Sequence, residues 1–400
     1  MKLINILLPL FFLTTNTHTV FAQNNNSPSA GSIRVCDDSN ADEETSALRK
    51  ELVALLRDKK FAAIEDTLKD REARTLKGEF RDQSLYRLTK FADSAEPELE
   101  PLMNEWVRNN PASFMALMVR ANFHLAVGWK KRGNKFSNAT SQDQFDAMNE
   151  SFKKAGSDLA ASSKLAPVSV LPYSGLINIA GSMAQSNDKI QDVLLRANKI
   201  DPQNYVVRKM AIWRLSPRWG GSFDALDKII EQAKSSKLNA ADLRRLEYSV
   251  LFEKGSHFKD VEKRPLEALP YFMQAAKMCD SYQAWAEVSS IEYTREDWPQ
   301  VEAAMNQYMR LHPDTAWGYN RRGWALQQQG RLKDAIADFK RSSELGNDYA
   351  QNKMGYFYMT GNGVPKDLAQ ARTLFAKANV QGNKTAKANL EYLARTLESK

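Results

Sequence analysis

The chain has 400 residues, a net charge of +8 at pH 7 and two cysteines. Acidic residues are interspersed with the basic ones along the whole length, so the sequence lacks the continuous basic stripe that follows nucleic-acid phosphates. None of the four histidines has a partner at metal-ligand spacing, and no HExxH, GxSxG or CxxC motif occurs. We therefore expect no nucleic-acid partner, no metal and no cofactor.

Residues 1–22 have the pattern of a secretory signal peptide. Lys2 is followed by the apolar stretch Leu3–Leu13, and Val20 and Ala22 place small residues where signal peptidase requires them. The apolar stretch is far shorter than the roughly 20 residues that cross a bilayer. No second long apolar run follows, so we expect cleavage after Ala22, export to the periplasm or beyond, and no transmembrane segment.

An irregular helical domain is predicted for residues 43–236. The polar segment 23–42 that precedes it has too few apolar side chains to order itself. From Glu43 onward apolar residues follow helical spacing, and no segment keeps the period of two that indicates a strand. A proline two residues after a Leu or Ile predicts where helices end, because proline cannot continue a helix. These prolines are Pro167, Pro202, Pro217 and Pro313.

Regular helical hairpins are predicted between residues 240 and 349. Met305 and Leu311 recur as Phe339 and Leu345 after one tetratricopeptide period, which is about 34 residues. The two most regular hairpins are 282–315 and 316–349. An earlier hairpin is expected to pair a helix from about Asp242 to Lys254 with one from Leu266 to Lys277.

The segment 350–400 resembles a Sel1-like repeat followed by a capping helix. Gly361-Asn362-Gly363-Val364 stands at the longer turn of such a repeat, where glycine takes positive φ without strain. The hairpins at 282–349 resemble tetratricopeptide repeats, although Arg322 and Ser342 replace small or apolar residues of the common pattern. Those two departures weaken the expectation of tight packing in that hairpin. The predicted fold is all-α, an α-solenoid of helical hairpins.

The N-terminal half resembles the domain of unknown function DUF4034. The resemblance covers about residues 45–235 and implies no catalytic residue. The residues that resemble this family are Trp106, Asn110-Pro111, Ser113, Trp129, Arg132-Gly133 and the segment Leu215–Ser222.

Eleven residues of the C-terminal repeats are expected to face the concave surface of the repeat stack. Trp317 and Trp324, like Tyr349 and Tyr356, are seven residues apart and so share one helical face. Trp and Tyr are frequent hot spots of interfaces, which favours a surface that binds a peptide or protein. The alternative is that these rings fill space between neighbouring repeats. The face comprises Gln283, Ala286, Ser290, Tyr293, Trp317, Asn320, Trp324, Gln327, Tyr349, Asn352 and Tyr356.

The segment Arg218-Trp219-Gly220-Gly221-Ser222 is the most motif-like part of the N-terminal half. Arg218 and nearby backbone N–H groups could bind an anion. The favoured interpretation is structural, because a diglycine after a helix is typical of an end cap. Separately, Cys36 and Cys279 could form one disulfide in an oxidising compartment, or Cys279 could be a free buried thiol.

Three functions are compatible with these features. The first is an exported, non-enzymatic scaffold that binds a peptide or protein in the groove of its C-terminal repeats. The second is an envelope enzyme, such as a hydrolase, with its site around Trp129, Arg132 and Arg218. The third is a small-molecule or glycan sensor that uses the Trp and Tyr side chains.

Overall fold

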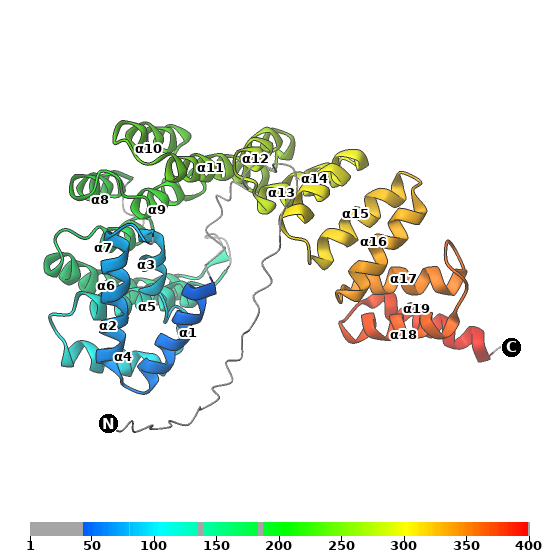
Figure 1. Ribbon diagram of the computed structural model, residues 1–400, viewed down its shortest axis with the longest axis horizontal. Helices are drawn as coiled ribbons and strands as arrows, with labels where there is room; N and C mark the ends of the chain where they lie inside the picture. The colour runs from blue at the N-terminus through cyan, green and yellow to red at the C-terminus, as the bar shows by residue number, and fades with distance from the viewer. Residues whose placement is uncertain (1–42, 80, 135–138, 183–186, 399–400) are drawn as a thin grey trace, which may run out of the picture. The chain divides into compact units, whose positions relative to one another are not determined.

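The computed structural model describes residues 43–79, 81–134, 139–182 and 187–398. Within these residues the chain forms nineteen α-helices and no strand (Figure 1). The all-α prediction is therefore confirmed. The predicted signal peptide and the polar segment 23–42 lie outside the described residues.

Ten helices form the N-terminal half. Three of these helices end shortly before a proline, as predicted. They end at Leu165, Ile200 and Arg214, two or three residues before Pro167, Pro202 and Pro217. The helices are α1 (Glu43–Arg57), α2 (Phe61–Leu76), α3 (Asp82–Leu88), α4 (Leu99–Asn109), α5 (Phe114–Arg132), α6 (Gln142–Leu165), α7 (Leu171–Ser182), α8 (Asn187–Ile200), α9 (Val206–Arg214) and α10 (Phe223–Ser235).

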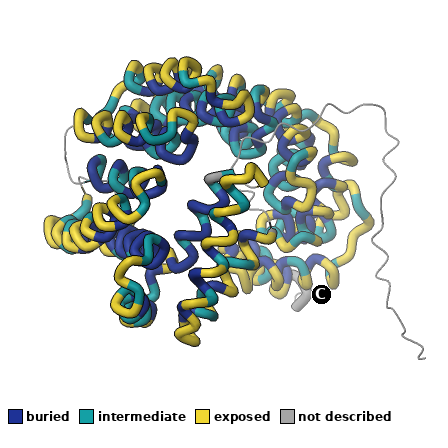
Figure 2. Tube along the Cα trace, turned by 60° about the vertical axis from the view of Figure 1, so that its left-hand side comes forward, coloured by how far each residue is buried: buried dark blue, intermediate teal, exposed yellow. Residues whose placement is uncertain are grey.

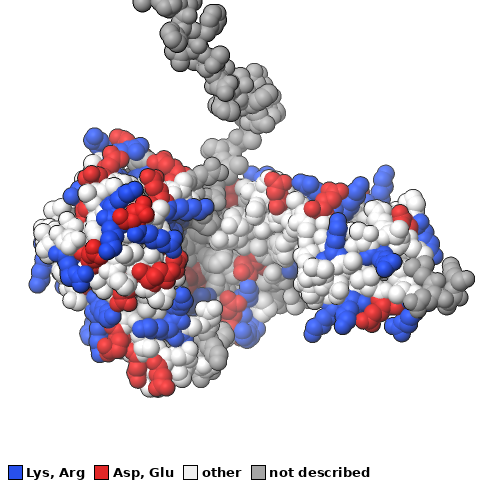
Figure 3. Space-filling model, turned by 90° about the horizontal axis from the view of Figure 1, so that it is seen from below, with Lys and Arg blue, Asp and Glu red and all other residues white. Residues whose placement is uncertain are grey.

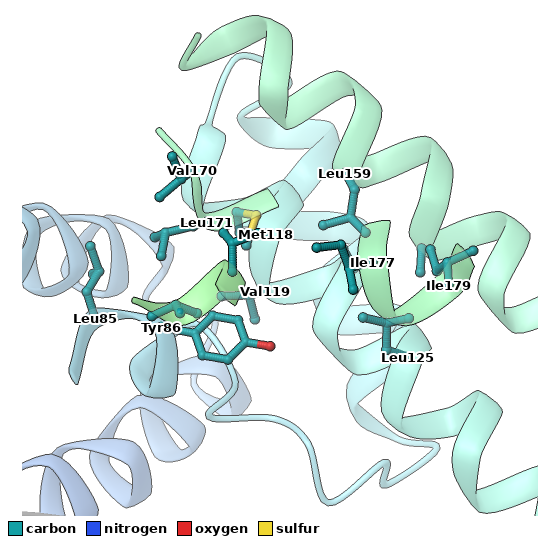
Figure 4. Close-up of a cluster of buried hydrophobic side chains, with 14 of the residues drawn as sticks. Leu85, Tyr86, Met118, Val119, Leu125, Leu159, Val170, Leu171, Ile177 and Ile179 are labelled. Atoms are coloured by element: carbon teal, nitrogen blue, oxygen red, sulfur yellow. The ribbon is translucent and has the colours of Figure 1, made fainter. Parts of the chain in front are cut away.

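One hydrophobic core joins these ten helices. Figure 4 shows part of it, where Met118 and Leu125 of α5 lie near Leu159 of α6 and Ile177 of α7. All four side chains are buried, and burial of such aliphatic groups stabilises a fold by roughly 1.5–3 kcal/mol each. Figure 2 shows the buried residues gathered along one side of most helices, as helical periodicity requires.

The remaining helices pair into successive hairpins in the predicted order. The helices are α11 (Ala240–Ser256), α12 (Pro265–Cys279), α13 (Tyr282–Thr294), α14 (Trp298–Leu311), α15 (Ala316–Gln328), α16 (Leu332–Glu344), α17 (Asp348–Thr360), α18 (Leu368–Val380) and the capping helix α19 (Lys384–Glu398). Residues 282–315 contain α13 and α14, and residues 316–349 contain α15 and α16. In the predicted Sel1-like turn, Gly361 and Gly363 have φ of +76° and +74°.

Glycines allow the two helices of several hairpins to approach closely. A Cβ added to Gly323 would lie 3.0 Å from the ring of Phe339, and one added to Gly355 would lie 2.7 Å from the ring of Phe375. Larger side chains would therefore force these helices apart. The same pairing occurs at Gly128 with Phe152 and at Gly255 with Phe272.

Arg322 holds its hairpin together, contrary to the expectation of looser packing. Its guanidinium donates to both carboxylate oxygens of Asp338 at 2.6 and 2.8 Å, and to Asn306 Oδ1 at 2.7 Å. Ser342 Oγ donates to the carbonyl oxygen of Ala316 at 2.6 Å. Polar bonds thus replace the apolar contacts of the common repeat pattern, and a bidentate pair of this kind is among the strongest side-chain contacts.

The N-terminal half contains the same arrangement of Arg, Asp and Asn, which we call a clamp. Arg120 of α5 donates to both oxygens of Asp158 of α6 at 2.7 and 2.8 Å, and to Asn104 Oδ1 of α4 at 3.1 Å. In both clamps the Asn comes 16 residues before the Arg, on the helix before the hairpin. The irregular half therefore contains a unit with the internal geometry of a C-terminal repeat.

Candidate binding face of the C-terminal repeats

The predicted binding residues lie on the first helices of three consecutive hairpins, α13, α15 and α17. We call this surface the first-helix face. Most of its residues are half-buried, but Tyr349 and Tyr356 are exposed, with 66% and 45% of their surface accessible.

Trp317 packs against the core and supports a cation. Its ring meets Tyr308 edge-on, with centroids 5.1 Å apart. The guanidinium of Arg321 lies 5.2 Å from the centre of the Trp317 ring and 4.2 Å from that of Tyr293 on α13. One cation on α15 thus joins the aromatic residues of two neighbouring repeats, which combines packing with cation–π attraction.

Trp324, two turns further along α15, has a similar arrangement with a cation from the next hairpin. Its ring meets Phe339 edge-on at 5.9 Å, and the ammonium of Lys353, on α17, lies 4.3 Å from its centre. Lys353 is also 5.4 Å from the ring of Phe357. Both tryptophan rings are half-buried against the core, and each has a cation over it.

No carboxylate of the described chain neutralises these two cations. Burial lowers the pKa of Arg321, opposed only by Tyr293, and burial alone lowers the pKa of Lys353. By contrast, Arg322 is held by Asp338, and Arg331 by Glu302 and Asp334. Arg321 and Lys353 therefore retain the capacity to bind an anion.

One face of the C-terminal repeats has an excess of charge of the same sign as these two cations. In Figure 3, Lys and Arg side chains predominate over Asp and Glu on the repeats at the right, whereas the two kinds alternate on the N-terminal half at the left. An excess of one charge attracts ligands of the opposite charge. The repeats therefore favour an acidic ligand over a basic one.

Sequence reasoning missed both cations. It selected residues by aromatic character, whereas Arg321 follows Trp317 by four positions and so shares its face. That spacing was a usable signal for Arg321. Lys353 comes from the next hairpin, and its position over Trp324 depends on how two repeats pack.

Two amide side chains of the first-helix face have unsatisfied acceptors. Asn320 Oδ1 and Gln327 Oε1 are buried and receive no hydrogen bond from the described residues. An unpaired buried acceptor costs roughly 1–3 kcal/mol, which a donor from a ligand recovers after rotation of the terminal amide. Asn352 differs, because its Oδ1 accepts a hydrogen bond from Asn389 Nδ2 of α19 at 2.9 Å.

The Arg218 segment forms a compact turn between α9 and α10. Gly220 is left-handed with φ of +88°, and a Cβ on Gly221 would overlap the carbonyl oxygen of Leu215 at 1.8 Å. Ser222 then caps α10 by accepting from the N–H of Ala225 at 3.2 Å. These features support the structural interpretation of the segment.

Arg218 lies against carboxylates, which leaves it less suited to bind an anion. Its guanidinium is 3.5 Å from Glu253 of α11 and 3.9 Å from Asp260 of the π-helical turn His257–Val261. Trp129 and Arg132, the other residues of the enzyme hypothesis, lie together, with the guanidinium 5.8 Å from the indole centre. The Trp129 ring is also 6.2 Å from that of Trp219, the residue after Arg218.

Three tryptophans enclose a buried arginine in this half. The guanidinium of Arg214 lies 4.0 Å from the ring centre of Trp213 and 4.8 Å from those of Trp129 and Trp219. Arg214 is fully buried, and one of its terminal nitrogens donates to Asn178 Oδ1. Burial lowers its pKa to about 9, while the surrounding indole faces favour the cation. We call this arrangement the tryptophan cage.

Cys279 is buried at the end of α12 and does not carry a free thiol. Its predicted partner, Cys36, lies outside the described residues. The bond between these two cysteines stays a prediction.

Two further properties of the described residues concern membranes and metals. No helix among them is long and apolar enough to cross a membrane. They also contain no cluster of three or more His, Cys, Asp or Glu side chains that could hold a metal ion.

Among solved structures the chain is similar to helical-repeat proteins. A Sel1 repeat protein from Oxalobacter formigenes is 15% identical over 76% of this chain and 83% of its own, with a TM-score of 0.40. A protective antigen of uropathogenic Escherichia coli with an SLR fold is 13% identical over 84% and 80%, with a TM-score of 0.39. A tetratricopeptide protein described as having an unusual peptide-binding site is 13% identical over 63% and 93%, with a TM-score of 0.24.

These TM-scores are below 0.5, so the fold is argued from the chain's own helices. No family model and no curated protein matches the chain. The resemblance of the N-terminal half to DUF4034 accordingly stays a prediction.

Proposed function

We propose that the protein is an exported, non-enzymatic scaffold whose first-helix face binds an extended peptide segment rich in carboxylates. The observation that carries the proposal is the pair of cations, Arg321 and Lys353, that lie over aromatic rings without a carboxylate partner among the described residues. A carboxylate that reaches either cation gains a charge-assisted hydrogen bond.

The rings and amides of the same face suit the rest of a peptide. Trp317 and Trp324 fix the direction of the two cations, so binding orders fewer side-chain rotamers. Asn320 and Gln327 offer acceptors to the backbone N–H groups of an extended chain. A nucleic acid meets only part of this pattern, because its phosphates can bind the cations but its backbone has no regular series of N–H donors for the two amides.

A fluorescently labelled acidic dodecapeptide tests the proposal. Binding is measured by anisotropy for the native chain, for Arg321→Gln with Lys353→Gln, and for a control that removes two exposed charges from the second helices, Lys340→Gln with Arg372→Gln. We expect at least a tenfold weaker affinity for the first double variant, because hydrogen bonds to charged groups contribute about 1.5–3 kcal/mol. Equal loss in the control would show only a general charge effect.

Export and the natural partner need separate experiments. Mass spectrometry of exported protein is expected to find a chain beginning at Gln23. A crosslinking pull-down from the cell envelope then identifies the partner, and a carboxylate-rich segment in that partner is the expected result.

A further inference from the structure

A pocket of about 310 Å³ lies where α11 and α13 meet α3 and α9 of the N-terminal half. Its apolar walls include Trp213 of α9, Phe252 of α11 and Tyr86 of α3. Its charged groups are Glu253 of α11 and Lys209 of α9. A volume near 300 Å³ with mostly apolar walls and few polar groups is typical of a small ligand or a single side chain.

The pocket stands in register with the first-helix face. One repeat period separates Ser249 on α11 from Gln283 on α13, and another separates Gln283 from Trp317 on α15. Both Ser249 and Gln283 line the pocket. Glu253 and Arg321 are two periods apart in the same way. The face that carries the unneutralised cations on α15 and α17 therefore continues through α13 to α11, where α3 and α9 close it as a pocket.

The charge at this register changes sign along the face. Glu253 occupies the position on α11 that Arg321 occupies on α15. The Glu253 side chain is 15% exposed, and Arg218 Nε lies 3.5 Å from its Oε2. That oxygen is buried and accepts no hydrogen bond from the described residues, although the hydroxyl of Ser216 donates to the carboxylate. A rotation of the carboxylate toward the pocket would present this acceptor to a ligand. An extended ligand thus meets a carboxylate at one end of the face and two cations at the other.

We infer that the pocket captures the amino terminus of the bound peptide, with an apolar first residue. This inference rests on the proposed function of the first-helix face. The α-ammonium binds Glu253, and the first side chain lies among Trp213, Phe252 and Tyr86. Lys209, whose ammonium lies 5.9 Å from the centre of the Tyr205 ring, also lines the pocket.

This arrangement also fixes the direction and length of the peptide. Packed helices lie about 8–10 Å apart and an extended chain advances about 3.3 Å per residue, so three steps from α11 to α17 need about nine residues. Carboxylates are then required in the second half of the peptide, where Arg321 and Lys353 lie. The predicted ligand is a segment with a free, apolar N-terminus followed by acidic residues.

Two synthetic dodecapeptides test the inference. Both begin with Phe, have Gly and Ser in the first half and Asp and Glu in the second, and carry a C-terminal fluorophore; one has a free α-amine and the other an acetylated one. We expect the free peptide to bind the native chain at least tenfold more tightly. Equal affinities would overturn capture of the amino terminus and leave the acidic-peptide proposal intact, whereas no binding of either peptide would contradict both.

A variant localises the effect. Glu253→Gln is expected to weaken the free peptide to the level of the acetylated one, without changing the affinity for the acetylated peptide. The unchanged affinity for the acetylated peptide reports that the variant is folded. Glu231→Gln, which removes an exposed carboxylate from α10, is the matched control and is expected to keep the tenfold preference. A preference that survives Glu253→Gln would place the amino terminus elsewhere.

Discussion

Both halves of the molecule place cations against tryptophans, but with opposite accessibility. In the tryptophan cage Arg214 is fully buried, is surrounded by three indoles and donates to Asn178. On the first-helix face Arg321 and Lys353 are half-buried and lie over tryptophan rings that meet core aromatic residues edge-on. The same attraction therefore stabilises the fold in one half and presents charge to a ligand in the other.

Truncation of the cage is expected to give the largest effect. Trp219→Ala removes one ring from Arg214 and leaves a cavity beside a buried cation, for an expected loss of about 3 kcal/mol in the free energy of unfolding. Arg214→Met keeps the volume without the charge and is expected to stay within about 1 kcal/mol of the native chain. Urea unfolding measures both, and a neutral Trp219→Ala would contradict a packing role for the cage.

The tryptophans of the first-helix face are expected to matter less for stability. Trp317→Ala and Trp324→Ala should each cost about 2 kcal/mol. That is less than for Trp219→Ala because, although all three rings are half-buried, only Trp219 packs against a fully buried cation. Affinity for the acidic peptide should fall as well, since the cations lose their supports. Thermal melts and anisotropy on the same variants measure both effects. A folded variant that binds the acidic peptide with native affinity would show that the rings are not part of the binding site.

A smaller effect is expected from pH. Burial raises the pKa of Glu253, although Arg218 and the hydroxyl of Ser216 oppose the shift. Because the folded state then holds its proton more tightly than the unfolded state, this group makes the free energy of unfolding decrease as pH rises from about 4.5 through the raised pKa. Urea titrations between pH 4 and 7 should show a shallower decline for Glu253→Gln, and identical slopes would contradict the assignment.

The smallest structural effect is expected from reduction of Cys279. If Cys36 is its partner, the bond ties a polar tail to α12, and its loss leaves the helical core intact. Alkylation with and without reductant, followed by mass spectrometry, identifies the partner. A free Cys36 thiol in the exported protein would rule out that bond.

Helical periodicity was enough to predict the architecture. The repeat spacing of Met305 and Phe339, and the glycines of the Sel1-like turn, correspond to the observed hairpins because each depends on local geometry. The departure at Arg322 was misjudged, since its partners Asp338 and Asn306 lie on other helices. A single sequence does not reveal which side chains meet across helices.

The candidate site was predicted in part for the same reason. The seven-residue spacing predicts that Trp317 and Trp324 share a face, but the position of Lys353 over Trp324 depends on how α17 packs beside α15. The pocket at Glu253 required α3 and α9, which belong to the irregular N-terminal half, to close over the end of the face. Repeat spacing carries no information on contacts of that kind.

Photo-crosslinking tests the central claim most directly. An acidic dodecapeptide with a photoreactive phenylalanine in its second half is irradiated with the native chain, and the linked residues are mapped by mass spectrometry. The account predicts crosslinks on α15 and α17, near Trp324 and Lys353, that are lost in Arg321→Gln with Lys353→Gln. Crosslinks confined to the second helices α14, α16 and α18, or to the tryptophan cage, would contradict it.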